Sequence, residues 1–259
     1  MYINIKSLVK SSLIRLFCWL FYFSKQGSVV LLYHSINDNL NDSSSVSKED
    51  FYKQIQYLIK KKFKFLQLAD IEEFIKNTHN KKGVMITFDD CYEDVFINAV
   101  PILERYKVPA VFFMPAGLSG KEMSGKKIMT WDQIKYLASN NLFEIGSHTM
   151  YHSHLARLNF DDAIKEIKES LVTLRSKINR EIISIAYPYG RYTDRILTNL
   201  KPLGFRLGFS VIPLHLYDCK DLFLIPRMSV NKFSIRFFPY FFKFGYRFYW
   251  KIRSLFLQK

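Results

Sequence analysis

The stretch Val84-Met85-Ile86-Thr87-Phe88-Asp89-Asp90 decides the fold, because it places two adjacent carboxylates directly after an apolar run. A short apolar run that ends in polar residues predicts a β-strand. Neighbouring side chains on an extended chain point in opposite directions, so Asp89 and Asp90 can take different roles. One would bind a metal while the other acts as a base. The alternative is that both acids belong to the start of the helix predicted from residue 92.

Strand-like and helix-like segments alternate on either side of this stretch. The strands are expected at residues 28–34, 84–88, 110–115, 143–147, 182–187, 206–211 and 223–230. The helices are expected at residues 48–61, 68–76, 92–106, 131–139, 161–178 and 194–200. Ser45 and Ser47 predict the start of the first helix, and residues 161–178 carry an apolar stripe at helical spacing. This alternation predicts an α/β fold, a distorted (β/α) barrel of about seven parallel strands, with its chemistry at the carboxyl ends of the strands.

The composition suits a single domain with appendages. Of the 259 residues, 49% are hydrophobic, which is enough for a core and argues against disorder. The formal net charge is +15, and residues 1–25 and 232–259, which contain no acid, carry eleven of these excess charges. The basic character therefore belongs to the two ends. The three cysteines are irregularly spaced, which argues against a disulfide-dependent secreted domain.

The two ends are predicted to interact with a membrane, at residues 1–27 and 232–259, around a catalytic domain at residues 28–231. The uncharged apolar run 16–23 is too short to span a bilayer, which needs about 20 residues. A signal peptide, a helix packed on the domain and an interfacial anchor stay open for this end.

The C-terminal end is typical of a helix lying in the membrane interface. Its basic residues share one helical face among many aromatic residues; they are Arg236, Lys243, Arg247 and Lys251. Nucleic-acid binding is the competing use of such a pattern, but no nucleic-acid fold motif accompanies it.

His148 and His152 follow the predicted strand 143–147 at a spacing of four residues. On a helical turn both imidazoles would project to one side, as a divalent metal requires. Either one could instead be a core or turn histidine. With a carboxylate from another strand end, the pair predicts a site for zinc, nickel, cobalt or iron. His154 is spaced less favourably and is interpreted as structural.

Three islands of sequence resemble the motifs of the polysaccharide deacetylase family, carbohydrate esterase family four, over roughly residues 28–230. Thr87-Phe88-Asp89-Asp90 resembles the first motif, which implies that Asp89 is the base and Asp90 a metal ligand. Ser147-His148-Thr149-Met150-Tyr151-His152 resembles the second, which implies that His148 and His152 bind the metal. Ala186-Tyr187-Pro188-Tyr189-Gly190 resembles the third, which implies that the Tyr189 N–H helps to form the oxyanion hole.

The chain also departs from the family pattern. Cys91 stands where the first motif usually has Gly, and Ala186 stands where many members have an Arg that orients the catalytic Asp. No C-terminal His motif supplies a general acid. Tyr33-His34 resembles the permuted branch, typified by deacetylases of poly-N-acetylglucosamine, which implies that His34 is the acid rather than a structural strand-end histidine. Arg227 would replace the missing guanidinium.

The resemblance implies a metal-dependent hydrolase, most simply with Zn²⁺, that removes an N-acetyl group from an amino sugar of a cell-envelope glycan. The basic ends predict a lipid-linked glycan and an anionic membrane surface as partners, at the cytoplasmic face, with no nucleic acid. Three alternatives stay open. They are an exported deacetylase of polymeric glycan, a non-catalytic membrane-bound glycan-binding module, and O-deacetylation or deformylation by the same site.

Overall fold

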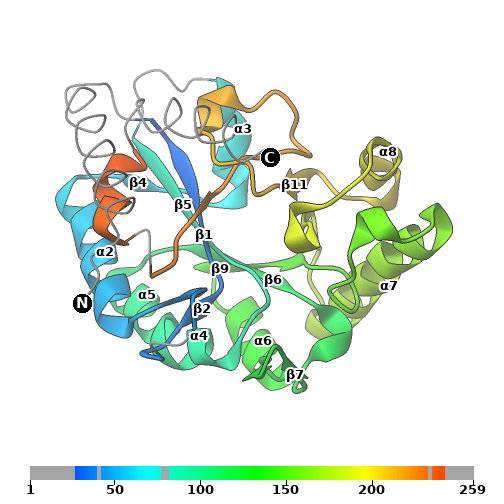
Figure 1. The fold of residues 1–259 in the computed structure, drawn as a ribbon, viewed down its shortest axis with the longest axis horizontal. Helices are drawn as coiled ribbons and strands as arrows, with labels where there is room; N and C mark the ends of the chain where they lie inside the picture. The colour runs from blue at the N-terminus through cyan, green and yellow to red at the C-terminus, as the bar shows by residue number, and fades with distance from the viewer. Residues whose placement is uncertain (1–26, 40–41, 77–81, 233–234, 243–259) are drawn as a thin grey trace, which may run out of the picture.

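A curled sheet of parallel strands forms the centre of the protein in the computed structural model, which describes residues 27–39, 42–76, 82–232 and 235–242. In this part of the chain the strand order is β11-β10-β9-β6-β5-β1-β12, with β4 also paired to β5. The bounds are β1 Val29–Tyr33, β4 Lys64–Phe65, β5 Gly83–Phe88, β6 Ala110–Met114, β9 Phe143–Ser147, β10 Ser184–Ala186, β11 Leu207–Phe209 and β12 Met228–Ser229. Figure 1 shows helices arranged round the sheet. The predicted distorted (β/α) barrel is confirmed.

Residues 225–230 join the two ends of this strand order. Ile225 forms a parallel bridge with Phe209 of β11, and Met228 pairs with Leu31 of β1. The segment therefore pairs first with β11 and then with β1, which closes the curl of the sheet. The sequence predicts one continuous strand over residues 223–230, and this prediction is wrong, because Pro226 has no N–H to continue the ladder.

The helices cover both faces of the sheet, with most of them on one face. Their bounds are α2 Lys48–Lys60, α3 Ile71–Lys76, α4 Glu93–Asn98, α5 Val100–Tyr106, α6 Trp131–Ser139, α7 Phe160–Ile178 and α8 Asp194–Leu203. The predicted start of the first helix is confirmed, since the Ser47 side chain accepts a hydrogen bond from the Asp50 N–H. The helix predicted at residues 92–106 is divided into α4 and α5, because Pro101 lies at the start of α5 and cannot donate to the preceding turn.

Two pairs of very short strands were not predicted. Strand β2 (Ser35–Ile36) pairs with β3 (Ser45–Val46), and β7 (Glu122–Met123) pairs with β8 (Lys126–Lys127). Ser124 and Gly125 connect β7 to β8 with φ of 52° and 72°, the left-handed pair that a two-residue hairpin turn requires. Strands of two residues are too short to show any periodicity in the sequence.

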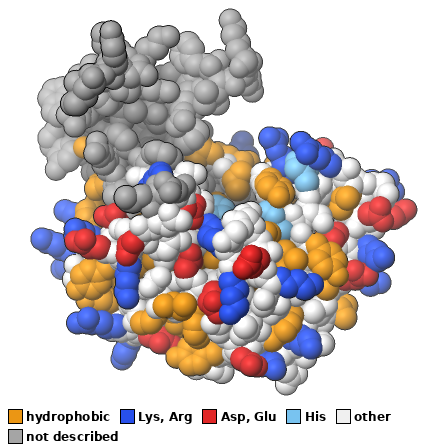
Figure 2. All heavy atoms as spheres, turned by 60° about the horizontal axis from the view of Figure 1, so that its bottom comes forward, with side chains coloured by type: hydrophobic (Ala, Val, Ile, Leu, Met, Phe, Trp, Pro, Cys, Tyr) orange, Lys and Arg blue, Asp and Glu red, His pale blue; other side chains and the backbone are white. Residues whose placement is uncertain are grey.

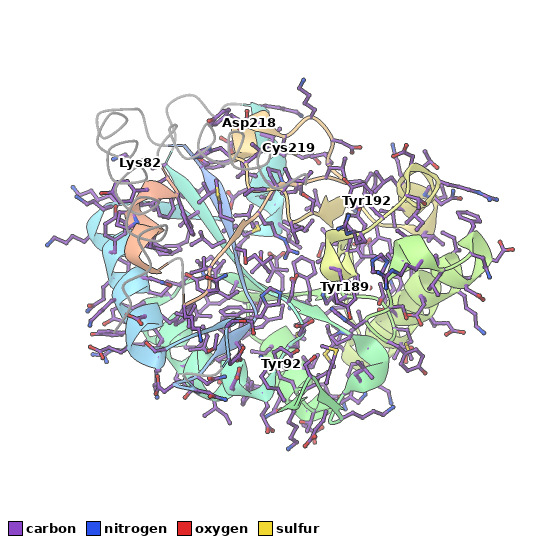
Figure 3. The ribbon with its side chains drawn as sticks, viewed as in Figure 1. Lys82, Tyr92, Tyr189, Tyr192, Asp218 and Cys219 are labelled. Carbon is purple, nitrogen blue, oxygen red and sulfur yellow. The ribbon has the colours of Figure 1, made fainter. Side chains whose placement is uncertain are left out.

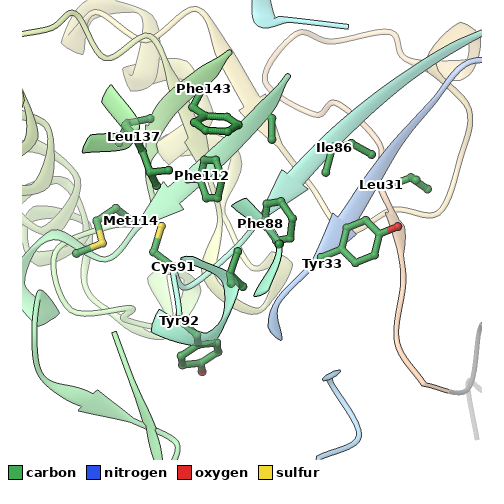
Figure 4. Packing of buried hydrophobic residues seen from close by; sticks show 14 of the residues in the cluster. Leu31, Tyr33, Ile86, Phe88, Cys91, Tyr92, Phe112, Met114, Leu137 and Phe143 are labelled. Carbon is green, nitrogen blue, oxygen red and sulfur yellow. The ribbon is translucent and has the colours of Figure 1, made fainter. Parts of the chain in front are cut away.

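Alternate residues of the central strands pack into two separate hydrophobic clusters, as the pleat of a strand dictates. The larger cluster contains Phe88, Phe112 and Phe143 (Figure 4). The ring centroid of Phe112 lies 5.1 Å from that of Phe88 and 5.5 Å from that of Phe143. The smaller cluster, on the opposite face of the strands, contains Phe113 and Phe209. Both faces of the sheet are therefore buried, which leaves the strand ends as the accessible part.

Three aromatic residues of the predicted C-terminal membrane segment belong to the hydrophobic core. Phe238, Phe241 and Phe242 are at most 3% exposed. The Phe242 ring centroid lies 4.5 Å from that of Phe63, and the Phe242 carbonyl accepts a hydrogen bond of 2.9 Å from the Gly27 N–H. The packed domain therefore continues beyond residue 231, because these rings gain more by joining the core than they could at a surface.

The remaining terminal residues, 1–26 and 243–259, lie outside the described part of the chain. The membrane interaction predicted for them stays a prediction. Among the described helices, none combines the length and the apolar character that crossing a bilayer requires.

Candidate active site

A cleft of about 560 Å³ opens at the carboxyl ends of the parallel strands. Among its lining residues, Asp89, Asp90 and His148 are at most 5% exposed, whereas Tyr189 is 62% exposed. Figure 2 shows histidine side chains next to hydrophobic ones on this face, and Figure 3 labels Tyr92 and Tyr189, which come from different strand ends. The cleft therefore brings together residues from several strands.

Asp89 follows β5 and is held by Arg227. The guanidinium donates from Nη1 to Asp89 Oδ1 at 2.6 Å and from Nη2 to Oδ2 at 2.7 Å. Its Nε donates to the Ser210 carbonyl at 2.9 Å, and its side chain is fully buried. This is a bidentate, charge-assisted pair. The structure places Arg227 against Asp89, where the sequence predicts it, and its part in the reaction stays a prediction.

The two adjacent carboxylates have opposite electrostatic surroundings. Burial alone would raise the pKa of Asp89, but the charge and hydrogen bonds of Arg227, together with the neighbouring histidines, outweigh burial and lower that pKa to about 2. Burial, reinforced by the charge of Asp89, raises the pKa of Asp90 to about 6. Asp89 is therefore ionised at any ordinary pH, whereas Asp90 is easily protonated when no cation is bound to it.

The backbone turns sharply between these acids. Asp90 and Cys91 have φ of 67° and 50°, in the left-handed region that favours glycine. The chain is therefore not extended at Asp90, and the expectation that the strand pleat separates the two side chains is wrong. The turn separates them instead. The conformation of Cys91 also gives a physical reason for the glycine usual in the resembling motif.

His148 and His152 approach each other, although not on a helix as the sequence predicts. Residues 149–151 form a turn in which Thr149 has a φ of 63°, and His152 follows with a φ of 57°. The ring centroids of the two histidines are 4.9 Å apart. The helical expectation is wrong because left-handed residues interrupt the chain, but the turn still directs both imidazoles to Asp90.

The residues Asp90, His148 and His152 fit a divalent metal. Asp90 Oδ1 lies 3.2 Å from His152 Nε2 and 3.5 Å from His148 Nε2, and a donor atom from each residue lies within 4.8 Å of the others. Asp90 Oδ1 is buried without a hydrogen-bond partner among the described residues. A buried acceptor facing two imidazole nitrogens needs a cation to satisfy it.

The protonation of His148 agrees with this reading. Its Nδ1 lies 2.8 Å from the Ala186 carbonyl, which can only accept, so Nδ1 carries the proton and the Nε2 lone pair faces Asp90. Burial lowers the pKa of His148 to about 3, which keeps the ring neutral. His154, interpreted as structural, stacks on the Tyr189 ring at 5.6 Å and is not in the predicted metal cluster.

His34 and Tyr189 also line the cleft. His34 follows β1, and its charge acts on the carboxyls of both Asp89 and Asp90, lowering their pKa values. Tyr189 has a φ of 58° in the turn Pro188–Gly190, which the Gly190 N–H closes on the Tyr187 carbonyl at 2.8 Å. The structure therefore gathers all seven residues predicted for the site, while the roles of His34 as acid and of the Tyr189 N–H as oxyanion donor stay predictions.

One wall of the cleft was not predicted. Lys126 of β8 donates from Nζ to Asp42 Oδ2 at 2.8 Å and to Ser44 Oγ at 3.2 Å, and lies 4.2 Å from the centre of the Tyr92 ring. This group joins the β7–β8 hairpin to the loop before β3. The turn pair Ser124-Gly125 is the one signal in the sequence that could have located the hairpin.

Comparison with known proteins agrees with this geometry. The polysaccharide deacetylase family profile matches residues 76–208. A poly-beta-1,6-N-acetyl-D-glucosamine N-deacetylase of Staphylococcus aureus is 30% identical over 197 residues, covering 72% of this chain and 68% of that protein.

Solved structures show the same fold. The Streptococcus pyogenes deacetylase PplD, in complex with acetate, has a TM-score of 0.74 and 26% identity, covering 85% of this chain and 99% of that one. IcaB from Ammonifex degensii has a TM-score of 0.72 and 24% identity, covering 82% of this chain and 95% of that one. With the paired carboxylates, the two histidines and the fold in agreement, the chain belongs to the polysaccharide deacetylase family of hydrolases, which cleave N-acetyl amide bonds.

Proposed function

We propose that this chain is a metal-dependent N-deacetylase that acts on an amino-sugar glycan of the poly-N-acetylglucosamine type in the cell envelope. The name of the Staphylococcus aureus relative supports the substrate class. The observation that carries the proposal is an ionised, clamped carboxylate beside a separate cluster of metal ligands. One carboxylate can therefore accept a proton while the other holds a cation.

Asp90, His148 and His152 would hold the metal, for which zinc is the first choice and nickel, cobalt or iron are alternatives. When bound, the metal supplies Lewis-acid activation of water and polarisation of the acyl carbonyl. Asp89 accepts the proton of the attacking water, since its pKa keeps it ionised and Arg227 fixes its orientation. The Tyr189 N–H stabilises the developing oxyanion, and His34 protonates the departing amine. The products are acetate and a free amino sugar.

The lipid-linked form of the substrate and the cytoplasmic membrane surface remain part of the proposal. The support for them is the excess of basic residues in the two ends of the sequence. Incubation with lipid-linked and with soluble polymeric N-acetylglucosamine, followed by mass spectrometry for the loss of one acetyl group, distinguishes the two substrate forms.

Two substitutions test the division of labour between the carboxylate and the metal ligands. Asp89→Asn removes the base but no metal ligand, so it is expected to abolish acetate release and to retain bound metal. His148→Ala removes a ligand, so it is expected to lose both. Metal content is measured by mass spectrometry of the dialysed protein, and it also shows that Asp89→Asn is folded. Normal turnover in Asp89→Asn would refute the assignment of the base.

A further inference from the structure

The turn that carries the two histidines is bound to helix α7 through one carboxylate. Glu166 accepts hydrogen bonds at Oε2 from the Met150 N–H at 3.1 Å and from the Tyr151 N–H at 3.0 Å. Met150 and Tyr151 lie between His148 and His152. Glu166 lies within α7, and nothing in the family resemblance assigns it a role. It therefore fixes the backbone of the turn at the point midway between the predicted metal ligands.

The turn needs such support because its conformation is strained. Thr149 is β-branched, and its φ of 63° costs about 1–2 kcal/mol relative to the right-handed region. His152 has a φ of 57°, so the turn enters and leaves through left-handed residues. Strain of this kind persists only where surrounding contacts determine the conformation.

On the opposite side of the turn, backbone carbonyls accept hydrogen bonds from residues 116 and 117. The Thr149 carbonyl accepts from the Ala116 N–H at 3.1 Å, and the Met150 carbonyl accepts from the Gly117 N–H at 2.8 Å. These bonds fix the carbonyl side of the turn. The N–H side of Met150 and Tyr151 is fixed by the Glu166 side chain, so a change at Glu166 alters this side alone.

Ser170 lies one helical turn after Glu166 on the same face of α7 and supports the start of the turn. The Ser170 and Ser147 hydroxyls are 2.8 Å apart, and Ser147 Oγ accepts from the Thr149 N–H at 3.2 Å. Side chains four residues apart on a helix lie above one another, so α7 presents both groups together. Helix α7 thus contacts the turn at its beginning and at its middle.

We propose that Glu166 is a positioning residue for the metal site: it holds residues 149–151 so that His148 Nε2 and His152 Nε2 both face Asp90. This inference rests on the proposed metal-dependent function. Metal sites tolerate displacements of about 0.5 Å before affinity falls, and a turn released from Glu166 can relax the left-handed residues that aim the histidines. Groups that hydrogen-bond the ligand side chains themselves typically contribute about 10–100-fold to metal affinity, and we expect an effect on the same scale for Glu166.

The experiment measures the affinity of the purified full chain for Co²⁺ and Zn²⁺ by competition with a chromophoric chelator. Glu166→Ala removes the acceptor and is expected to weaken both affinities about 10–100-fold, with a changed Co²⁺ visible spectrum. Glu166→Gln keeps a carbonyl oxygen at the same place, and is expected to restore most of the affinity. Glu169→Ala is the matched control, because Glu169 is an exposed residue of α7 that pairs only weakly with Lys165 at 4.0 Å.

Thermal unfolding in the presence of a chelator separates positioning from simple stabilisation. If Glu166→Ala lowers the unfolding temperature but binds Co²⁺ as tightly and with the same spectrum as the unsubstituted chain, the positioning role is wrong. Glu166→Gln binding as weakly as Glu166→Ala would also refute it. If the unsubstituted chain binds neither ion, the proposed metal-dependent function fails, and this inference fails with it. If the unsubstituted chain and Glu166→Ala bind the ions with equal affinity, only this inference is refuted and the proposed function stands.

Discussion

Two neighbouring residues, Asp89 and Asp90, receive opposite properties from their surroundings. Both carboxyls are buried, and burial by itself raises a carboxyl pKa. Arg227 contacts both oxygens of Asp89 and counteracts the effect there, whereas Asp90 faces two imidazoles that can share a cation with it. Asp89 is thus ionised without a metal, whereas ionised Asp90 is stabilised by a bound cation. Two acids with divergent pKa values are typical of a site that divides base and ligand roles.

The pKa of Asp90 predicts how metal binding depends on pH. Asp90 must lose its proton before it can bind a cation, and its pKa of about 6 means that protons compete below that pH. Burial lowers the pKa of His148 to about 3, so that ring stays neutral in this range, and burial also lowers the pKa of His152. Apparent affinity for Zn²⁺ is therefore expected to fall about tenfold per pH unit below about pH 6 and to be flat above it.

Chelator competition across this pH range measures the slope. Asp89 supplies the internal control, because its pKa of about 2 keeps it ionised throughout. An affinity that starts to fall only near the pKa of an ordinary carboxyl would contradict the assignment of Asp90.

Substitution of Arg227 should reveal what the guanidinium contributes. Arg227→Met leaves Asp89 as a buried charge without its partner, which is expected to destabilise the fold by about 3–5 kcal/mol. Arg227→Lys keeps a charge but not the planar pair of donors, so it should retain more stability and still lose turnover. Chemical denaturation and acetate release are the measurements. If Arg227→Lys turns over as fast as the unsubstituted chain, orientation of Asp89 by the fork of donors is not required.

At the scale of elements, the site depends on short segments as much as on the main strands. Residues 225–230 deliver Arg227 to the interior while they join β11 to β1. The β7–β8 hairpin and the loop before β3 form one wall of the cleft, and Lys126 connects them. Asp42 and Lys126 are largely buried, with 17% and 20% of their side chains exposed. This wall lines the same cleft as the predicted metal ligands.

Lys126→Met should therefore affect substrate binding more than chemistry. The loss of the contacts to Asp42 and Ser44 loosens the wall, so KM is expected to rise several-fold with a smaller change in kcat. The assay is run well above the pKa of Asp90, because the charge of Lys126 also lowers that pKa. Lys127→Met is the matched control, since Lys127 is more exposed and pairs with Glu93 at 3.1 Å. Equal effects of both substitutions, or an effect on kcat alone, would argue against this role.

At the scale of the whole molecule, part of the C-terminal segment predicted to bind a membrane belongs to the core. Phe238, Phe241 and Phe242 complete the core beside α2 and Phe63. The basic residues from Lys243 onward lie outside the described part of the chain, and the proposed membrane contact now rests on them and on residues 1–26. A deletion must respect this division if it is to test membrane binding rather than folding.

Two truncations make the comparison. Removal of residues 243–259 is expected to release the protein from anionic vesicles while its unfolding temperature and metal content stay unchanged, because near-surface cations contribute about 1 kcal/mol each. Removal of residues 232–259 also takes Phe238, Phe241 and Phe242, and the loss of one buried Phe typically costs about 3–5 kcal/mol. Vesicle sedimentation and thermal unfolding are the measurements, with neutral vesicles as control. Persistent binding after the shorter deletion would contradict a C-terminal anchor.

The sequence by itself determined the framework of strands and helices, because buried strands appear as short apolar runs and amphipathic helices as apolar residues at helical spacing. It also located the residues of the site, since these follow strand ends: Asp89 and Asp90 after β5, His148 after β9, and His34 after β1. The bounds of β9 and α6 agree with those predicted.

Only the tertiary structure decided how those residues are aimed and what surrounds them. Examples are the left-handed turns at Asp90, Thr149 and His152 and the burial of Phe238, Phe241 and Phe242. The contacts of Lys126 and Glu166 likewise join segments far apart in the sequence. The local spacing of apolar residues does not predict such contacts, because they form only when the sheet curls and brings its strand ends together. For this protein the sequence therefore specified which residues meet, and packing specified their orientation, charge state and support.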